Sequence, residues 1–259
     1  MSLDEKTVTY ETRDHIAIIT FNRPMQRNAV NNQLALELEN AVAQLESDDN
    51  IHVGILTGAG SVFCAGMDLK AFAAGETEAA LNYLKKFASL NSDHRKKPII
   101  AAVHGAALAG GFEVMLACDI VVAANGTLFG LPEVMRGLVA GAGGAFRLGQ
   151  RISPVKAKEL LLTADVIDTS AAMSLGLINY QVAENEVLNK ALQIAHKISK
   201  NAPLAVQASL RLANAALGAD EAHLWQLNDQ IWPVISSTKD ALEGSIAFAE
   251  KREPLWKGR

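Results

Sequence analysis

The apolar positions of the chain follow two different periods, which predict strands and helices in alternation through its first half. Largely apolar runs at 15–21, 53–57, 99–103 and 120–124 are typical of strands buried in a parallel sheet. In segment 31–46 the apolar residues instead recur at helical spacing with acidic residues between them, which predicts an amphipathic helix. A short apolar helix is expected at 113–118. This alternation indicates an α/β fold.

The second half of the chain predicts a different organisation, because strand-like runs give out after about residue 144. Helical segments follow, separated by proline, glycine or polar residues: 154–163, 170–175, 186–199, 203–217, 220–231 and 239–251. We therefore expect a spiral α/β core over residues 1–195 and a helical C-terminal region over residues 196–259. No Pro/Gly/Ser-rich linker separates them, so the helical region is expected to pack on the core or on a neighbouring subunit.

Composition and charge narrow the classes of function. The chain has 259 residues, of which 49% are apolar and 20% charged, and its net charge of −4 argues against nucleic acid or an anionic membrane as main partner. The polar N-terminus lacks the character of a targeting peptide, and no apolar run approaches the roughly 20 residues of a membrane span, which favours a cytoplasmic protein. Cys64 and Cys118 lack metal-type spacing and are expected to be reduced thiols. The histidines are scattered, so no metal site is expected.

Two glutamates in distinctive surroundings are the strongest candidates for chemistry. Glu113 follows the pair Gly110-Gly111 in what looks like a strand-to-helix turn, where first-turn N–H groups are free to bind a developing oxyanion. Glu133 follows Pro132 and precedes a glycine-rich stretch at 137–144, which favours close backbone approach. Two carboxyl groups in one site can divide general-acid and general-base work. At this level, acids that merely favour the positive ends of helices remain an alternative.

A third candidate is the turn Cys64-Ala-Gly-Met-Asp-Leu69 after the second strand. Gly66 would let the backbone turn closely around a ligand, so that the N–H of Met67 could point at a carbonyl oxygen. The alternative is an ordinary turn in which Asp68 caps a short helix over residues 69–74.

Taken together, the order and spacing of these motifs resemble the enoyl-CoA hydratase (crotonase) family over almost the whole chain. The matching segments are Gly66-Met-Asp-Leu, Lys97-Pro-Ile-Ile-Ala-Ala-Val-His-Gly, Gly110-Gly-Phe-Glu, Cys118-Asp-Ile, Pro132-Glu133, Gly141-Ala-Gly-Gly and the tail Phe248-Ala-Glu-Lys-Arg-Glu-Pro-Leu-Trp-Lys-Gly. The resemblance implies repeated ββα turns with a helical C-terminal part, assembly as trimers or pairs of trimers, and a substrate bound as a CoA thioester. CoA would be part of the substrate, and no separate cofactor is expected.

The resemblance also implies roles for the candidate residues. The oxyanion hole falls on the backbone N–H groups of Met67 and Gly110, and the catalytic glutamates fall on Glu113 and Glu133. Because both glutamates are present, the resemblance favours hydration of 2-trans-enoyl-CoA to 3-hydroxyacyl-CoA. Glu133 is the expected proton donor to C2 and Glu113 the group that orients and deprotonates water, although one shared water would leave that assignment open.

For CoA itself the family pattern indicates two regions of the chain. The implied substrate-binding residues are Arg27, Asn28, Ala29, Ala65, Gly66, Asp68, Leu69, Lys70, Phe248 and Lys251. Phe248 and Trp256 would close the site from a neighbouring subunit or pack within the tail, and solvated surface cations are the alternative for Arg27 and Lys251. At three positions the chain departs from the family pattern. Ala109 replaces the third glycine of many hydratases, Met67 replaces a residue that is often smaller, and Leu131 replaces a residue that is often polar. We expect these differences to affect the preferred acyl chain more than the reaction.

Three other functions remain open. The same scaffold supports isomerisation of 3-enoyl thioesters and dehydration of specialised groups such as carnitinyl-CoA, whose enzymes share the Phe-Ala-Glu-Lys-Arg type of tail. An RNA-binding relative is disfavoured by the acidic balance. The only dense basic cluster, 94–97, is expected to be a solvated segment before a strand.

Overall fold

The main sheet has six strands, five of them parallel, in the computed structural model of this chain, which describes residues 6–75, 77–88 and 95–259. The strands are β1 (Val8–Arg13), β2 (Ile16–Phe21), β3 (Val53–Gly58), β4 (Ile99–Val103), β6 (Ile120–Ala124) and β9 (Tyr180–Val182), in the order β1-β2-β3-β4-β6-β9. Only β1 runs antiparallel to its neighbour, β2. The four predicted strands are confirmed as β2, β3, β4 and β6. Their apolar runs are nearly continuous because both faces of the sheet are covered.

A second, smaller sheet carries the turns that lead into the candidate site. It consists of β5 (Ala106–Leu108), β7 (Leu128–Gly130) and β8 (Ile167–Asp168), with β5 parallel to β7 and β7 antiparallel to β8. The expectation that strands end near residue 144 was wrong, because β8 and β9 lie beyond it. Both are too short, at two and three residues, to produce an apolar period.

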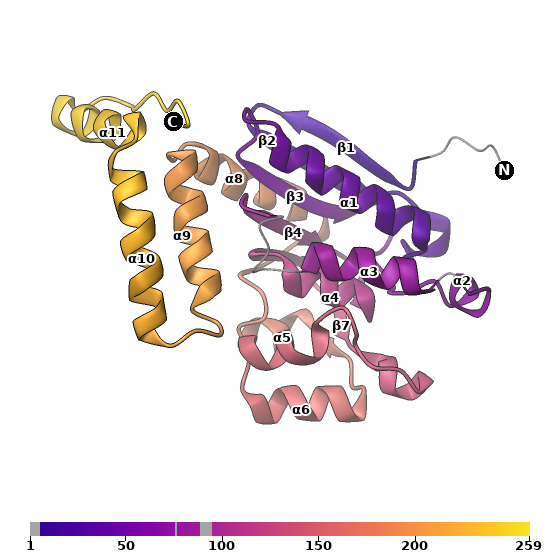
Figure 1. Cartoon of the computed structure of the whole chain (residues 1–259). Coiled ribbons are helices and arrows are strands. Elements are labelled where there is room, and N and C mark those ends of the chain that lie inside the picture. The colour runs from indigo at the N-terminus through magenta and orange to yellow at the C-terminus, as the bar shows by residue number, and fades with distance from the viewer. Residues whose placement is uncertain (1–5, 76, 89–94) are drawn as a thin grey trace.

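Helices cover both faces of the main sheet (Figure 1). On one face lie α1 (Asn32–Ser47), α3 (Thr77–Ala88) and α4 (Gly110–Ala117), and on the other lies α8 (Val187–Ser199), whose Val187, Ala191 and Ala195 pack on the strands. The predicted helix at 31–46 is confirmed as α1, whose cap Asn31 accepts a hydrogen bond from the Leu34 N–H at 3.0 Å.

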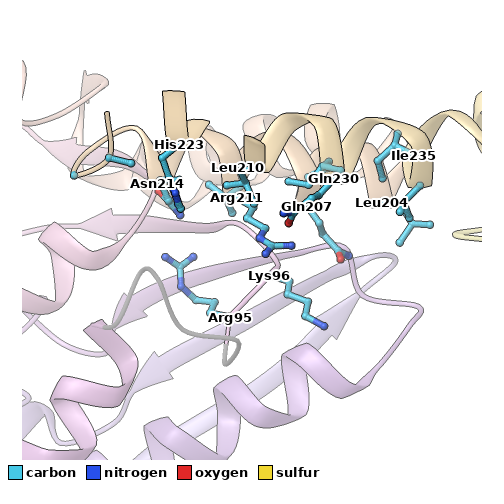
Figure 2. Close-up of a pocket in the computed structure, with 17 residues that line it drawn as sticks. Arg95, Lys96, Leu204, Gln207, Leu210, Arg211, Asn214, His223, Gln230 and Ile235 are labelled. Carbon is cyan, nitrogen blue, oxygen red and sulfur yellow. The ribbon is translucent and has the colours of Figure 1, made fainter. Parts of the chain in front are cut away.

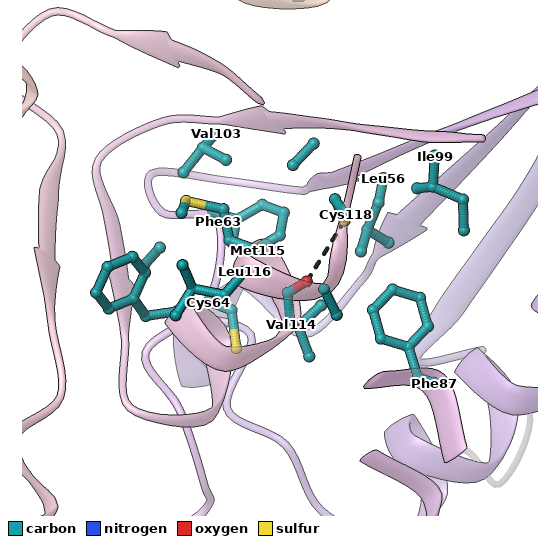
Figure 3. Close-up of a cluster of buried hydrophobic side chains, with 14 of the residues drawn as sticks. Leu56, Phe63, Cys64, Phe87, Ile99, Val103, Val114, Met115, Leu116 and Cys118 are labelled. Carbon is teal, nitrogen blue, oxygen red and sulfur yellow. Dashed lines mark hydrogen bonds between the residues drawn. The ribbon is translucent and has the colours of Figure 1, made fainter. Parts of the chain in front are cut away.

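Helix α4 is buried along its whole length, which explains why its sequence shows no polar face. Figure 3 shows Val114, Met115 and Leu116 of this helix packed among side chains from the sheet. The helix begins at Gly110, three residues earlier than predicted, because the glycine pair forms its first turn rather than the loop before it. Cys118 follows it, and both cysteines are buried free thiols.

Short elements connect these layers. They are η1 (Pro24–Gln26), α2 (Leu69–Ala73), η2 (Pro132–Arg136), α5 (Gly144–Arg151), α6 (Pro154–Thr163), α7 (Thr169–Ser174) and η3 (Glu184–Glu186). Asp68 caps α2 by accepting hydrogen bonds from the Lys70 and Ala71 N–H groups. This agrees with the alternative interpretation of the turn, in which Asp68 caps a short helix.

A C-terminal arm of three helices stands at one side of the molecule (Figure 1). Its helices are α9 (Pro203–Ala215), α10 (Glu221–Ser236) and α11 (Lys239–Glu250), close to the predicted ranges except that α10 continues through Pro233. Helix α10 has no buried residue and α9 buries only Pro203. The expected division at 195/196 falls inside α8, which packs on the sheet, so the arm begins at Pro203.

The prediction of a solvated basic cluster at 94–97 was wrong for Arg95 and Lys97, which are buried, whereas Lys96 is exposed as expected. His94 lies outside the described residues. The buried Arg95 guanidinium pairs with the Asp119 carboxylate at 2.6 Å, and the buried Lys97 ammonium donates to the carbonyls of Leu45 and Asp48 at 2.8 and 2.7 Å. Lys97 thereby satisfies carbonyl groups at the C-terminal end of α1, where a cation is favoured.

Within the described ranges, no helix is long and apolar enough to cross a membrane. The same part of the chain contains no group of three or more His, Cys, Asp or Glu side chains that could hold a metal ion.

Candidate active site

Backbone bridges fix the orientation of the Met67 peptide. The Val30 N–H donates to the Gly66 carbonyl, and the Asp68 N–H donates to the Val30 carbonyl, both at 2.8 Å. This pattern is that of a parallel bridge centred on Val30, so the N–H of Met67 itself points away from Val30. Among the described residues, the hydrogen bonds leave the Met67 N–H without a backbone acceptor.

The first turn of α4 approaches Met67 from the other side. A Cβ placed on Gly110 would lie 3.8 Å from the Met67 nitrogen, and one placed on Gly66 would lie 3.3 Å from the Gly110 nitrogen. The Gly110 N–H belongs to the first helical turn and also has no backbone acceptor in the described part of the chain. Two free N–H groups therefore lie close together, which is the arrangement that an oxyanion hole requires.

The residue before Gly110 is held in an unusual conformation. Ala109 has φ 48° and ψ −126°, a region that favours glycine, because its N–H donates to the Gly130 carbonyl at 2.9 Å while its own carbonyl accepts from Glu113. Such strain costs on the order of 1–3 kcal/mol.

We expect Ala109→Gly to raise the free energy of unfolding by about 1 kcal/mol, because the relief of strain exceeds the extra entropy of glycine in the unfolded chain. Chemical denaturation measures this. A matched Ala→Gly change at Ala43 in α1, a helical position, is expected to destabilise by about 1 kcal/mol instead. Equal destabilisation by the two changes would contradict strain at Ala109.

Glu113 is held by a glycine-rich loop. The residue is 4% exposed, and its Oε1 accepts hydrogen bonds from the Ala142 and Gly144 N–H groups at 2.8 and 2.9 Å. Burial raises the pKa of Glu113, while these two hydrogen bonds and the charge of Arg147 oppose that rise. The predicted close backbone approach at 137–144 is thus an approach to Glu113, and a Cβ on Gly144 would lie 2.8 Å from the Glu113 Cγ.

Glu133 has a very different environment. It lies in the first turn of η2, and within the described structure neither of its buried carboxyl oxygens has a hydrogen-bond partner. Burial, reinforced by the nearby charge of Glu113, raises the pKa of Glu133 to about 7. The structure thus brings the two predicted glutamates together, one hydrogen-bonded and one with a carboxyl group that exchanges its proton near neutral pH.

The predicted CoA residues near the N-terminus form one continuous surface with Met67. The Ala65 N–H donates to the Arg27 carbonyl at 3.0 Å, so the loop at 27–29 lies against the loop at 65–68. Arg27, Leu69 and Lys70 are exposed, while Ala29 and Ala65 are half-buried.

Two residues of that set have structural tasks for their side chains. The fully buried Asn28 amide donates to the Ala59 and Val62 carbonyls at 2.9 and 2.8 Å, and its backbone N–H donates to the Arg23 carbonyl at 2.9 Å. Asp68 caps α2 and pairs with Arg23 at 3.1 Å. Neither side chain is therefore available to a ligand without breaking these bonds.

Phe248 and Lys251 are not brought to this site by their own chain. Both belong to the end of α11, at the far side of the molecule from α2 and η2 (Figure 1), and Phe248 is 87% exposed. Trp256, by contrast, packs within the tail, where its Nε1–H donates to the Lys200 carbonyl at 2.6 Å.

A separate cavity of about 770 Å³ lies between the arm and the core. Figure 2 shows α9 and α10 on one side of it and Arg95 and Lys96 on the other. Arg95 and Lys96 come directly before β4, at its N-terminal end. Gly110 comes after the C-terminal end of β4, beyond the short strand β5. The cavity is therefore distinct from the space around the two glutamates, and it marks where the arm stands away from its own core.

Sequence reasoning did not single out three contributors to the site. They are the N–H groups of Ala142 and Gly144 and the buried side chain of Arg147. The glycine-rich stretch was the available signal for the two N–H groups, since glycine permits such close contact. No sequence signal distinguished Arg147 from a surface cation.

Comparisons with known proteins agree over nearly the whole chain. A family model described as enoyl-CoA hydratase/isomerase matches residues 11–259. Enoyl-CoA hydratase EchA19 of Mycobacterium tuberculosis is 39% identical over 254 residues, covering 96% of each chain. Carnitinyl-CoA dehydratase of Proteus mirabilis is 37% identical over 254 residues, covering 96% of this chain and 97% of the relative. The crystal structure of enoyl-CoA hydratase from Mycobacterium tuberculosis H37Rv superimposes with a TM-score of 0.89 and 44% identity, over 98% of this chain and 100% of that one.

Proposed function

Because the chain belongs to the enoyl-CoA hydratase/isomerase family, we propose that it is a hydro-lyase that adds water reversibly to 2-trans-enoyl-CoA and forms 3-hydroxyacyl-CoA. The observation that carries the proposal is the pair of glutamates with buried carboxyl groups in unlike environments, together with two N–H groups that have no backbone acceptor in the described chain. A hydration reaction needs one group to take a proton from water and another to give a proton to carbon, and these environments suit that division.

The proposed mechanism uses the two N–H groups first. The thioester oxygen of the substrate accepts hydrogen bonds from Met67 and Gly110, which stabilise the negative charge that develops there as water attacks C3. Removing one such donor in other enzymes costs about 10²–10³ in turnover, or about 3–4 kcal/mol of transition-state stabilisation. The donors are backbone groups held by helix α4 and by the bridge to Val30, so they need no reorganisation during the reaction.

The glutamates then complete the addition. Glu113 accepts a proton from the attacking water, whose oxygen bonds to C3, and Glu133 delivers a proton to C2 as the enolate collapses. One water is consumed, and the proton gained by Glu113 replaces the proton lost by Glu133, so that proton exchange between the two or with solvent restores the starting state.

We propose that CoA binds along the surface formed by Arg27, Ala29, Ala65, Leu69 and Lys70, with the fully buried Asn28 beneath it. The contact between loops 27–29 and 65–68 supports this position next to Met67. No cofactor beyond the CoA of the substrate is needed for the steps above.

We further propose that the chain works as a homotrimer or a dimer of trimers. The arm supports this, because Trp225, Trp232 and Val234 on α10 are each at least 60% exposed and the arm buries little on its own core. In such an assembly Phe248 and Lys251 would reach the site of a neighbouring subunit. Sedimentation equilibrium measures the state, and a monomer at micromolar concentration would contradict this part of the proposal.

A turnover screen over 2-enoyl-CoA thioesters of graded length and branching tests the reaction. Loss of the 2-enoyl absorbance is expected with at least one member, and not with a Glu113→Gln, Glu133→Gln double variant that controls for non-enzymatic addition. No turnover with crotonyl-CoA and longer 2-enoyl thioesters would overturn the hydratase assignment. The screen also includes a 3-enoyl-CoA and carnitinyl-CoA. Turnover of the first would indicate isomerisation, and turnover of the second would indicate the dehydration for which the Proteus relative is named.

A further inference from the structure

The Arg147 side chain lies behind the loop that holds Glu113. It is 6% exposed, and its Nη1 donates to the Ala142 carbonyl at 3.2 Å. The Ala142 N–H and the Gly144 N–H donate in turn to Glu113. Arg147 therefore fixes the peptide that links the two N–H groups on which Glu113 depends.

The backbone is shaped to admit this guanidinium. Gly143 has φ 106°, and a Cβ at that position would lie 2.0 Å from the Arg147 Nη1. Any other residue at 143 would both strain the backbone and displace the guanidinium. The loop and the arginine thus form one unit, in which the glycine makes room for the cation behind the glutamate.

Few charged groups among the described residues lie near Glu113 and Arg147. In the described part of the chain, the charged groups that influence Glu113 or Arg147 are Glu133 on η2, Arg151 on α5, and Arg95 before β4, which is itself paired with Asp119. From α3, the apolar side chains of Leu81 and Leu84 lie near Gly141 and Gly110.

The guanidinium acts on only one of the two carboxyl groups. Burial lowers the pKa of Arg147 to about 10, which still leaves it a cation at neutral pH. Its charge favours the ionised form of Glu113, whereas Glu133 gains no comparable cation and is opposed by the charge of Glu113. The arrangement therefore separates the protonation states of two otherwise similar side chains.

We propose that Arg147 is a positioning residue that keeps Glu113 ionised and aimed at the substrate water, and so makes Glu113 the base and Glu133 the acid. This proposal rests on the proposed hydratase function for its kinetic consequence. Its electrostatic consequence, the charge state of Glu113, needs no substrate.

Two variants of Arg147 and one matched control test the proposal. Arg147→Gln removes the charge, and Arg147→Lys keeps it without the planar fork of donors. Arg151→Gln removes an equal charge one helical turn along α5, where the guanidinium donates to the Cys118 carbonyl and, among the described hydrogen bonds, to no part of the glutamate loop. Thermal unfolding followed by circular dichroism establishes that each variant is folded.

The direct measurement is a pH titration of the Glu113 carboxyl carbon by ¹³C NMR, with the signal identified by its loss in Glu113→Gln. Loss of the cation raises the pKa of a carboxyl group, so Arg147→Gln is expected to move this titration to higher pH by about one unit or more. Arg147→Lys should fall between wild type and Arg147→Gln, and Arg151→Gln should leave the titration in place.

The kinetic measurement is the acidic limb of kcat/KM for the best 2-enoyl-CoA found in the screen. Because the base must be ionised, the limb should move to higher pH in Arg147→Gln, with a loss of about tenfold or more in turnover at neutral pH. An unmoved Glu113 titration in a folded Arg147→Gln protein would overturn the proposal, and so would a shift in Arg147→Lys as large as that in Arg147→Gln. A moved titration in a protein without hydratase turnover would instead contradict the proposed function alone.

Discussion

Glu133→Gln is expected to lower hydration turnover by about 10²–10⁴-fold, the usual contribution of a positioned proton donor. Glutamine has nearly the same shape but cannot give a proton to C2. Because the carboxyl oxygens of Glu133 have no hydrogen-bond partner within the described residues, the change removes no internal bond. Substrate binding and the melting temperature near pH 5 should therefore stay close to those of wild type, as measured by KM and differential scanning calorimetry.

The pH dependence gives this prediction a second readout. With a pKa of about 7, Glu133 is protonated below neutral pH and loses its proton as the pH rises. The kcat/KM of wild type should therefore decline above about pH 7, and this basic limb should be absent from the residual activity of Glu133→Gln.

Stability should follow the same titration. A carboxyl group whose pKa is raised on folding contributes stability that is complete below its unfolded pKa, here near 4.5, and is lost as the pH rises through about 7. Wild type should thus lose stability relative to Glu133→Gln between about pH 5 and pH 8. A Glu133→Gln protein that keeps more than a tenth of wild-type turnover would remove Glu133 from the role of acid.

Glu113→Gln provides the comparison, and its loss of turnover should be of similar size. Its structural consequence differs, because the Oε1 of Glu113 accepts two N–H groups that the glutamine carbonyl can still accept only if the amide takes one orientation. The double variant should be only slightly slower than either single variant, since the two residues act in one proton-transfer sequence.

The order of strands and helices was predictable because each follows from local pattern. Strands β2, β3, β4 and β6 are nearly continuous apolar runs, and α1 has one apolar face. By contrast, β9 is a three-residue strand in a polar stretch, which exists only because β6 offers a free edge for Tyr180–Val182. Pairing of that kind is a long-range contact that no window of sequence contains.

The burial of Arg95 and Lys97 shows the same limit for charged residues. Both were expected in solvent, yet each finds acceptors from distant segments: Asp119 for Arg95, and the end of α1 for Lys97. A lysine or arginine is buried when such partners are supplied, and the supply depends on the fold rather than on neighbours in sequence.

For the candidate site, the residue pattern singled out the two glutamates, but their expected roles as acid and base came from the family resemblance and not from the pattern. Glu113 and Glu133 both follow a helix-start signal, and each could have been the acid. The difference arises from what surrounds the carboxyl groups in space. Two N–H groups and Arg147 act on Glu113, whereas burial is the main influence on Glu133, whose carboxyl oxygens accept no hydrogen bond from another described residue.

Gly111→Ala is expected to lower turnover by about 10²–10³-fold and to reduce the free energy of unfolding by about 1–3 kcal/mol. A Cβ at position 111 would lie 2.4 Å from the carbonyl oxygen of Cys64 and 2.9 Å from its carbonyl carbon. Because these are backbone atoms, no side-chain rotation relieves the contact. The first turn of α4 must then move away from the segment at 64–67.

This displacement bears directly on the two N–H groups. Gly110 precedes the substituted residue, and Met67 lies three residues beyond Cys64, so the change widens the space between the two donors. Donors that are misplaced stabilise the developing enolate charge poorly, and kcat should fall more than KM rises. Steady-state kinetics at a temperature where circular dichroism shows the variant fully folded separates this loss from unfolding.

Gly149→Ala is the matched control, since Gly149 lies within α5 and its added Cβ would meet only the Ala157 Cβ at 3.9 Å. Alanine in a helix interior is favoured over glycine by roughly 0.5–1 kcal/mol, so this variant should be slightly more stable and fully active. If Gly111→Ala instead kept wild-type turnover while losing stability, the spacing between the Met67 and Gly110 N–H groups would not limit the reaction, and the charge on the thioester oxygen would have to be stabilised elsewhere.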